Sequence, residues 1–324
     1  MKYGTLKGVN KKVSRYLLGT MYVQDTKEER ARFDCAWENG INAIETAVGY
    51  GARPGSAELF IRTWMDANKI DREDVVILTK CSHPSTFRNR AHSFDISSDL
   101  FDSLAKLRTD YVDVLFMHRD DPDIPVKEIM DTLDWHYREG RIHAIGVSNW
   151  TLERVQEANR YAMENGLEPI SVIESHYSLA EQIEPPYFEG DGTISGPKYA
   201  DERRWYVENN ISVASYSSLS GGFFSGRIDR KSFEEDPDSY MFSTFNAYCD
   251  DVNFDRLERA QILADEKHVT LPQIALAYTL CSDMNVFPII GAANPEEVKS
   301  SVGALDLCLT REECDWLDLT SDER

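Results

Sequence analysis

Short apolar runs alternate with longer segments of helical periodicity along the whole chain. The helical segments place apolar residues three or four positions apart, as Leu100, Leu104 and Leu107 do on one face. The short runs have the length and apolar character of buried strands. They span residues 15–18, 43–45, 75–79, 112–117, 142–147, 171–174, 212–216 and 286–290. The pattern therefore predicts eight strands, each followed by a helix.

Eight strand–helix repeats are typical of a parallel barrel. An open, doubly wound sheet would also carry a Gly-x-Gly-x-x-Gly turn after an early strand, and the sequence has none. Helix starts are indicated at Asp255 and at Asn294-Pro295, where proline takes the first helical position. We expect a single α/β domain over residues 1–324, folded as a (β/α)8 TIM barrel.

Two long segments interrupt this repeat. Residues 184–200, rich in proline and glycine, follow the sixth predicted strand, and residues 218–255 follow the seventh. Segments after strands lie over the C-terminal face of a barrel, so we predict active-site loops; surface insertions without a role are the alternative. Their aromatic and charged side chains are Tyr187, Phe188, Asp191, Phe223, Phe224, Arg227, Asp229, Arg230, Tyr240, Phe242, Phe245 and Tyr248.

Composition narrows the function classes. The chain has 35 basic and 56 acidic residues, and this net charge of -21 argues against binding nucleic acid or anionic membrane. No apolar run approaches the roughly 18 residues that cross a bilayer, and the N-terminus lacks the layout of a secretion signal. The six cysteines are scattered without a Cys-x-x-Cys pair, so we expect reduced thiols and no metal site. We expect a cytoplasmic protein whose partner is a small molecule.

Residues at the predicted strand ends would face a common site. They are Gly19, Thr20, Glu45 with Tyr50 beyond it, Lys80, His118, Ser148, Asn149, Glu174, Tyr216 and Gly291. Lys80 ends an apolar strand, where an ammonium needs a counter-charge, and Glu45 on a neighbouring strand can supply it. A cation beside a tyrosine favours the phenolate and lowers the pKa of the tyrosine towards the working range. These residue types suit protonation of a carbonyl oxygen while hydride reaches the carbon.

The ordered motifs resemble the aldo-keto reductase superfamily over essentially the whole chain. The first hairpin and strand are similar in Tyr3-x-x-Leu6-x-Gly8 and Leu18-Gly19-Thr20-Met21. Further matches are Glu45-Thr46-Ala47-x-x-Tyr50-Gly51, the run from Leu104 through Asp113 into His118, Gly146-Val147-Ser148-Asn149-Trp150, and Ser215 to Gly222. The resemblance implies hydride transfer between a nicotinamide cofactor and a carbonyl or alcohol.

The resemblance also implies roles for single residues. Tyr50 would be the general acid, Lys80 its partner, Glu45 the carboxylate behind the lysine, and His118 the group that positions the carbonyl. The expected cofactor residues are Gly19, Thr20, Ser148, Asn149, Glu174, Tyr216, Ser217, Ser218, Leu219, Ser220, Gly221, Gly222, Gly291, Ala292, Ala293, Asn294, Glu297 and Ser301. The Tyr216 ring would stack on the nicotinamide, and backbone amides of 217–222 would bind the pyrophosphate. Tyr22 and Trp150 are candidate substrate walls.

Three positions depart from the family pattern. Glu45 replaces the usual aspartate behind the lysine, and Glu174 replaces the usual glutamine. A carboxylate at 174 adds negative charge near the nicotinamide and could favour its oxidised form. Glu297 stands where the family often has an arginine for the 2′-phosphate of NADP. A carboxylate repels phosphate and accepts from a ribose hydroxyl, so we expect NAD(H) to be preferred, with NADP(H) as the alternative through Lys299.

Other functions stay open at this point. A glycosidase would use two carboxylates such as Glu45 and Glu174, but this leaves Tyr50 and Lys80 without a role. A non-catalytic, cofactor-binding barrel is a second alternative, since two family positions are altered. A redox-neutral sugar epimerase or lyase with retained NAD is a third. Aromatic faces with polar rims suit a sugar or polyol, which we favour as substrate, and also aromatic ketones.

Overall fold

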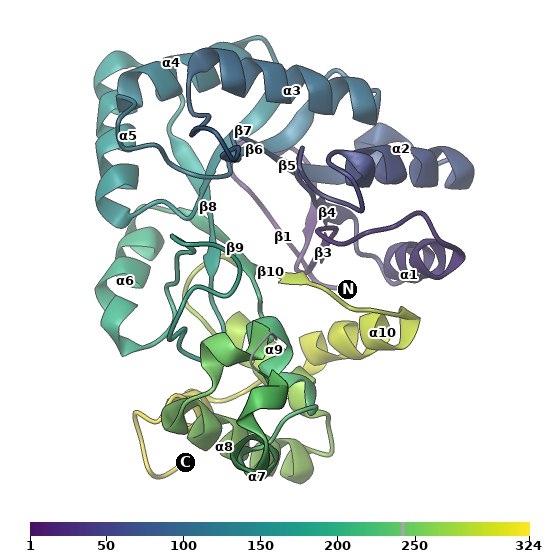
Figure 1. Cartoon of the computed structure of the whole chain (residues 1–324), viewed down its shortest axis with the longest axis vertical. Helices are drawn as coiled ribbons and strands as arrows, with labels where there is room; N and C mark the ends of the chain where they lie inside the picture. The colour runs from purple at the N-terminus through teal and green to yellow at the C-terminus, as the bar shows by residue number, and fades with distance from the viewer. Residues whose placement is uncertain (241–243) are drawn as a thin grey trace.

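The structure is a computed structural model that describes residues 1–240 and 244–324. The barrel strands are β3 (Leu17–Gly19), β4 (Ala43–Glu45), β5 (Val76–Cys81), β6 (Val112–Met117), β7 (Ile142–Ser148), β8 (Ile170–His176), β9 (Ser212–Tyr216) and β10 (Val286–Ile290). They are parallel and close into a barrel in the order β10-β3-β4-β5-β6-β7-β8-β9. The predicted (β/α)8 fold is therefore confirmed (Figure 1).

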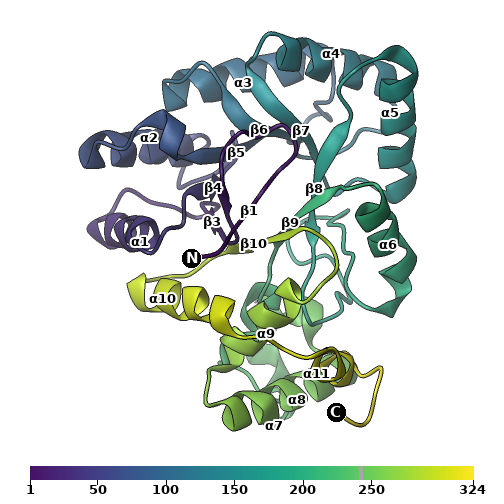
Figure 2. The same ribbon diagram turned by 180° about the vertical axis from the view of Figure 1, so that it is seen from behind.

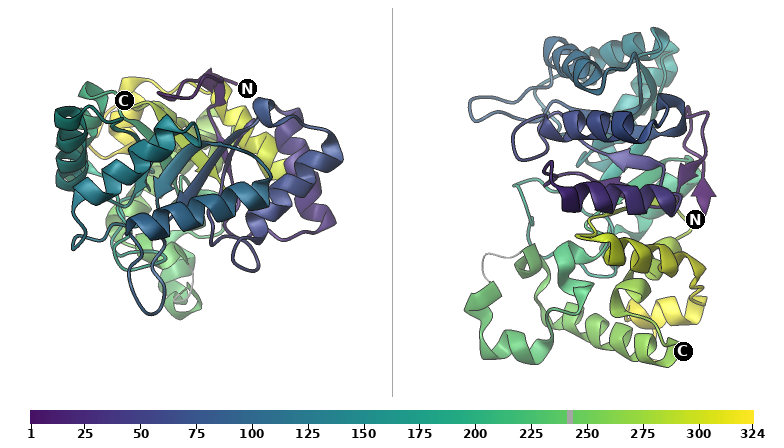
Figure 3. Two further views of the ribbon diagram at one scale, coloured as in Figure 1. Left: turned by 90° about the horizontal axis from the view of Figure 1, so that it is seen from above. Right: turned by 90° about the vertical axis from the view of Figure 1, so that its right-hand side faces the viewer.

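Helices surround this barrel. They are α1 (Lys27–Glu38), α2 (Ser56–Asn68), α3 (Ser93–Leu107), α4 (Val126–Arg138), α5 (Leu152–Asn165), α6 (Ala200–Glu208), α7 (Arg230–Glu235), α8 (Asp251–Lys267), α9 (Leu271–Leu280), α10 (Pro295–Gly303) and α11 (Arg311–Leu317). The helical periodicity predicted for this segment is confirmed, because Leu100, Leu104 and Leu107 are all buried on α3. In side view, α7 and α8 lie at the far end of the molecule from α3 and α4 (Figure 3).

Apolar side chains fill the inside of the barrel. The inner cluster includes Leu17, Val114 and Phe116. Gly146 on β7 leaves room for the Phe116 ring, because a Cβ at 146 would lie 2.4 Å from that ring. The hairpin of β1 (Tyr3–Gly4) and β2 (Val13–Ser14) crosses the N-terminal end of the barrel and contributes Leu6, among others, to the same cluster (Figure 2). The filled interior leaves the C-terminal end as the place for a site.

Some element boundaries differ from the predictions. The first barrel strand begins at Leu17, two residues later than predicted, and the preceding Arg15 side chain donates to the Asn285 side chain and the Val286 carbonyl. Helix α8 begins at Asp251 and not at Asp255, since the Asp250 side chain accepts the Asn253 N–H as an N-cap. Helix α10 begins at Pro295 as predicted.

The segment 218–255 is not one open loop. It contains the short helices η3 (Ser220–Ser225), α7, η4 (Pro237–Tyr240) and η5 (Thr244–Tyr248) before α8 begins. Phe223, Phe224 and Tyr248 are buried in a second core with α8 and α9, so they pack inside the fold and do not offer a substrate surface. Asp229 caps α7, and Arg230 forms ion pairs with α8. Phe242 lies outside the described residues, and so do the side chains of Tyr240 and Phe245.

Along the described ranges, no helix combines the length and apolar character that a bilayer crossing requires.

Candidate active site

A cavity of about 650 Å³ opens at the C-terminal ends of the barrel strands. Strand-end residues form its floor, and helices α1 and α10 and the segments after β8 and β9 form its walls. The cavity brings together residues expected from the sequence: Gly19, Tyr22, Glu45, Tyr50, His118, Ser148, Asn149, Glu174, Tyr216, Ser217, Ser218, Leu219, Gly221, Gly222, Gly291, Ala292, Ala293, Glu297 and Ser301. Its volume lies within the range of ordinary ligand-binding pockets.

Lys80, fully buried at the end of β5, organises the floor of this cavity. Its ammonium forms an ion pair with Glu45 from β4 and lies 3.4 Å from the Glu174 carboxylate of β8. It also donates to the Thr46 carbonyl at 3.2 Å. We call Lys80, Glu45 and Glu174 the lysine centre. Lys80 therefore has the expected counter-charge in Glu45 and a second one in Glu174, so two carboxylates face one ammonium.

Tyr50 lies directly above the lysine centre. Its hydroxyl accepts a hydrogen bond of 3.2 Å from Lys80, whose Nζ is 4.5 Å from the centre of the tyrosine ring. Burial raises the pKa of Tyr50 well above its ordinary value, the charge of Glu174 raises it further, and Arg119 opposes both. The expectation that a cation brings this pKa down therefore does not hold in the structure as it stands. Tyr50 is a protonated phenol, the state required of an acid.

His118, after β6, stands across from the tyrosine. The two rings are 5.7 Å apart in an edge-on arrangement. Burial lowers the pKa of His118 well below its ordinary value, and the charges of Lys80, His83 and Arg119 lower it further. The imidazole is therefore neutral, and its buried Nδ1 has no partner among the described residues. A neutral imidazole can hydrogen-bond to a carbonyl oxygen without competing with Tyr50 for the proton.

The expected nicotinamide residues form one hydrogen-bonded group. Ser148 Oγ accepts from the Asn149 side chain at 2.8 Å. The Asn149 Oδ1 accepts from the Tyr216 hydroxyl at 2.9 Å and from the Gly192 amide at 2.8 Å. The Asn149 oxygen is thus already occupied in holding the Tyr216 ring and the segment after β8.

Residues 217–222 form a tight turn along one wall. Ser217, Ser220, Gly221 and Gly222 all have positive φ, between 50° and 102°, which glycine adopts without strain. The Ser220 and Gly222 amides donate to the carbonyls of Ser217 and Leu219, at 2.6 and 3.0 Å. The expectation that all amides of this turn face a pyrophosphate is therefore too broad, because these two are engaged inside the turn. The Ser220 side chain is buried against Ser178.

The opposite wall is the start of α10. Asn294 caps this helix through the Glu296 and Glu297 amides, so its side chain serves the helix. The Glu297 carboxylate accepts from the Ala293 amide at 2.8 Å. Arg227, from the segment after β9, reaches across to within 3.8 Å of the same carboxylate. A cation therefore lies beside the position where the sequence showed only an acid.

The segment after β8 is fastened over the floor by Arg119. This arginine directly follows His118, forms an ion pair with Asp191 and donates to the Gly190 carbonyl at 3.1 Å. The other Asp191 oxygen accepts the amides of Tyr187 and Phe188, at 2.9 Å each. Both aromatic residues line the cavity as a result.

Comparisons with known proteins agree on one family. The sequence model described as the aldo/keto reductase family matches residues 17–321. The chain belongs to this family. The probable aryl-alcohol dehydrogenase AAD4 of Saccharomyces cerevisiae is 26% identical over 299 residues, which cover 88% of this chain and 85% of that protein. Norsolorinic acid reductase B of Dothistroma septosporum is 29% identical over 296 residues, covering 88% and 70%.

The fold of a solved family member is similar as well. The crystal structure of the thermostable aldo-keto reductase Tm1743 in complex with epalrestat superposes with a TM-score of 0.73 at 23% identity, covering 99% of this chain and 100% of that one. As an aldo-keto reductase, the protein is an oxidoreductase. Members of this family act on small carbonyl or alcohol substrates with nicotinamide cofactors, typically NADP(H). This membership supports an oxidoreductase over the glycosidase and the non-catalytic barrel.

Two expected positions fall elsewhere in this aldo-keto reductase. Trp150 is only 8% exposed and packs in the core between strands and helices, with Arg154 over its ring, so it does not form a cavity wall. Thr20 lies beneath the cavity, where its hydroxyl donates to the Glu45 carbonyl at 3.0 Å. Tyr22, in contrast, is 72% exposed at the cavity mouth.

Sequence reasoning missed other lining residues. Arg119 could have been found from its place directly after His118 at a strand end. Glu29 and Arg32 come from α1, where their ion pair at 2.8 Å resembles an ordinary surface contact between residues three apart on a helix.

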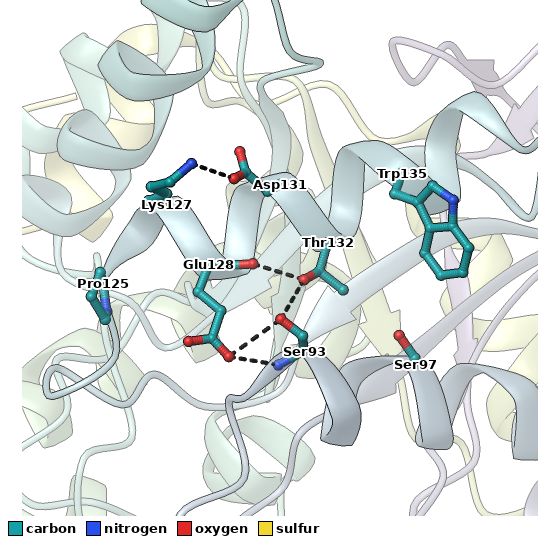
Figure 4. Close-up of a pocket in the computed structure, with 8 residues that line it drawn as sticks. All are labelled: Ser93, Ser97, Pro125, Lys127, Glu128, Asp131, Thr132 and Trp135. Carbon is teal, nitrogen blue, oxygen red and sulfur yellow. Dashed lines mark hydrogen bonds and ion pairs between the residues drawn. The ribbon is translucent and has the colours of Figure 1, made fainter.

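A second hollow lies between α3 and α4 on the outside of the barrel (Figure 4). Its polar groups satisfy each other: Glu128 accepts from the Ser93 amide and hydroxyl, and Thr132 donates to Ser93. Lys127 pairs with Asp131 on the same helix. These contacts join two helices and leave no polar side chain directed at a ligand.

Proposed function

We propose that the protein is an NAD(P)-dependent oxidoreductase in which Tyr50 exchanges a proton with the oxygen of a carbonyl or alcohol substrate. The observation that carries the proposal is the contact of the Tyr50 hydroxyl with the buried ammonium of Lys80 beside a neutral His118. A bound nicotinamide cofactor supplies or accepts the hydride at the substrate carbon.

The protein groups divide the work on the proton. In reduction, Tyr50 donates its proton to the substrate oxygen, and Lys80 stabilises the phenolate that results. Glu45 fixes the ammonium in place through their ion pair. His118 donates a hydrogen bond that orients the substrate oxygen toward Tyr50. In oxidation the same groups act in reverse.

The cavity fits a nicotinamide dinucleotide in size and lining. Ser148, Glu174 and the Tyr216 ring would hold the nicotinamide, and the left-handed turn at 217–222 would approach the pyrophosphate where glycine leaves room. The α10 start, from Gly291 to Ser301, would hold the adenosine ribose. The further inference below depends on this placement.

We propose that NAD(H) is preferred over NADP(H). The support is Glu297, whose carboxylate lies at the expected 2′ position and is fixed by the Ala293 amide. Arg227 works against the preference, but its charge faces Glu297 across an exposed contact of 3.8 Å. Family members typically use NADP(H), so this preference would separate the protein from most relatives.

For the substrate we favour a sugar or polyol, because a charged side chain, Arg119, lies over the aromatic ring of Phe188 in the lining of the same cavity. An aromatic alcohol or ketone is the second candidate. It is favoured by the half-exposed Phe188 ring and by the names of the relatives, an aryl-alcohol dehydrogenase and a norsolorinic acid reductase.

A titration of the protein with NADH, NADPH and their oxidised forms, followed by tryptophan fluorescence, tests the proposal. Tight binding of NAD(H) is the expected result, and it would be followed by a panel of sugar and aryl carbonyls and alcohols. Preferred binding of NADP(H) would overturn the cofactor preference alone. Binding of no form would overturn the proposed function, and turnover without added cofactor would indicate a retained cofactor and a redox-neutral reaction.

A further inference from the structure

Glu174 is placed beside the nicotinamide by the proposed function, but the proton transfer described above does not use its charge. Its side chain is 4% exposed and lines the cavity. One carboxylate oxygen, Oε1, contacts Lys80 at 3.4 Å. The other, Oε2, is buried and has no partner among the described residues. A buried acceptor without a donor costs free energy, which a ligand that approaches this oxygen can recover.

The charges around Glu174 do not balance. The lysine centre holds two carboxylates and one ammonium. The nearby guanidinium of Arg119 pairs with Asp191 and therefore does not offset the second carboxylate fully. The cavity floor thus carries an excess of about one negative charge when both glutamates are ionised.

We propose that Glu174 sets the preference of the site between the two redox forms of its cofactor, with the ionised carboxylate favouring the cationic, oxidised nicotinamide over the neutral, reduced one. The inference rests on the proposed function, because it requires the nicotinamide end of the cofactor to lie over the strand ends. The oxidised ring cancels the excess charge of the floor. The reduced ring leaves that charge uncompensated.

The same charge count predicts a proton linked to the redox form. Burial raises the pKa of Glu174, with Lys80, Arg119 and Ser148 opposing. A cationic ring lowers this pKa, whereas a neutral ring leaves it raised, so Glu174 releases its proton when the oxidised form binds and keeps its protonation state when the reduced form binds. The preference for the oxidised form is therefore full at high pH and is lost as pH falls through the raised pKa.

Other groups that titrate or carry charge face Glu174 from the surrounding elements. They are Lys80 on β5, Glu45 on β4, Tyr50 after β4, His118 and Arg119 after β6, and Tyr216 on β9. Both tyrosines have pKa values raised well above 10, and the arginine stays charged. We assign the pH dependence to Glu174, whose pKa burial raises above its ordinary value.

The test is the ratio of dissociation constants, reduced over oxidised, for wild type and Glu174→Gln, which keeps the shape and removes the charge. At about pH 8 the variant should lower this ratio about tenfold or more, because unit charges some 5 Å apart at an effective dielectric near 20 interact at least that strongly. At about pH 6 the difference should shrink. Glu157→Gln, on the exposed face of α5, removes an equal charge away from the cavity and should leave the ratio unchanged.

A second measurement needs no variant. Calorimetry of wild type in buffers of different ionisation enthalpy should show proton release with the oxidised form and none with the reduced form. Equal ratios for wild type and Glu174→Gln, or equal proton release for both forms, would overturn the inference while leaving the proposed function intact. If Glu174→Gln does not fold, the calorimetry decides. If wild type binds neither form, the proposed function fails first.

Discussion

Replacing Lys80 with methionine should destabilise the protein in a way that depends on pH. The ammonium is fully buried and contacts Glu45, the Thr46 carbonyl, the Tyr50 hydroxyl and Glu174. Methionine fills the space of the side chain but leaves two buried carboxylates without a cation. Removing one partner of a buried ion pair costs about 3–5 kcal/mol, so we expect a loss of this size near neutral pH.

The sign of the pH effect follows from the carboxylates. Without Lys80, burial raises the folded-state pKa of Glu174 further above the unfolded value of about 4.3. A raised folded pKa means that stability is retained at low pH and lost as pH rises. The deficit of Lys80→Met relative to wild type should therefore be smaller at about pH 5 than at about pH 8.

Urea unfolding with linear extrapolation at both pH values measures this deficit. The double variant Lys80→Met/Glu174→Gln is the matched control, since it removes one of the two stranded carboxylates and should recover part of the loss at high pH. Equal deficits at the two pH values, within about 0.5 kcal/mol, would refute the charge arrangement described for the lysine centre. The slope of the unfolding curve should stay unchanged if only stability is affected.

Three further changes have defined outcomes. Arg119→Met should release the segment that Asp191 holds over the cavity. We expect the substrate KM to rise about tenfold and hydrogen exchange at 186–191 to increase, with little change in cofactor affinity. Unchanged exchange would contradict the role of this ion pair. Glu297→Arg should lower the dissociation constant for NADP(H) about tenfold relative to NAD(H), and no change would mean that the 2′ position lies elsewhere. Gly146→Ala should lower the free energy of unfolding, measured by heat or urea, by about 1–3 kcal/mol, because the added methyl group contacts the Phe116 ring. A variant as stable as wild type would show that the barrel interior rearranges to accommodate the methyl group.

The strands and the strand-end residues of the cavity could be predicted because they follow local rules, whereas the lining residues at 217–222 and 291–301 came from the family resemblance. A buried strand needs a short apolar run, and its C-terminal end marks the site in any parallel barrel. Lys80 stood out because a charge at the end of such a run needs a partner. Glu45 followed as that partner, and the ion pair is present.

What could not be predicted depends on barrel closure. Glu174 reaches Lys80 across the floor, although β5 and β8 are separated by two strands. Arg227 and Glu297 meet although they are far apart in the sequence. Trp150 directly follows the cavity residues Ser148 and Asn149, but its ring packs in the core between the strands and the helices, because the side-chain direction changes after the strand ends. The raised pKa of Tyr50 likewise required the burial and the second carboxylate to be seen together.

The most direct test of the central claim is the turnover of Tyr50→Phe. The variant and wild type would be mixed with saturating reduced cofactor and an active carbonyl substrate, and the absorbance of the reduced nicotinamide followed. The account predicts cofactor binding like that of wild type and a fall in kcat of about a hundredfold or more, since the variant lacks the proton that Tyr50 donates. Turnover equal to that of wild type would contradict the assignment of Tyr50 as the acid.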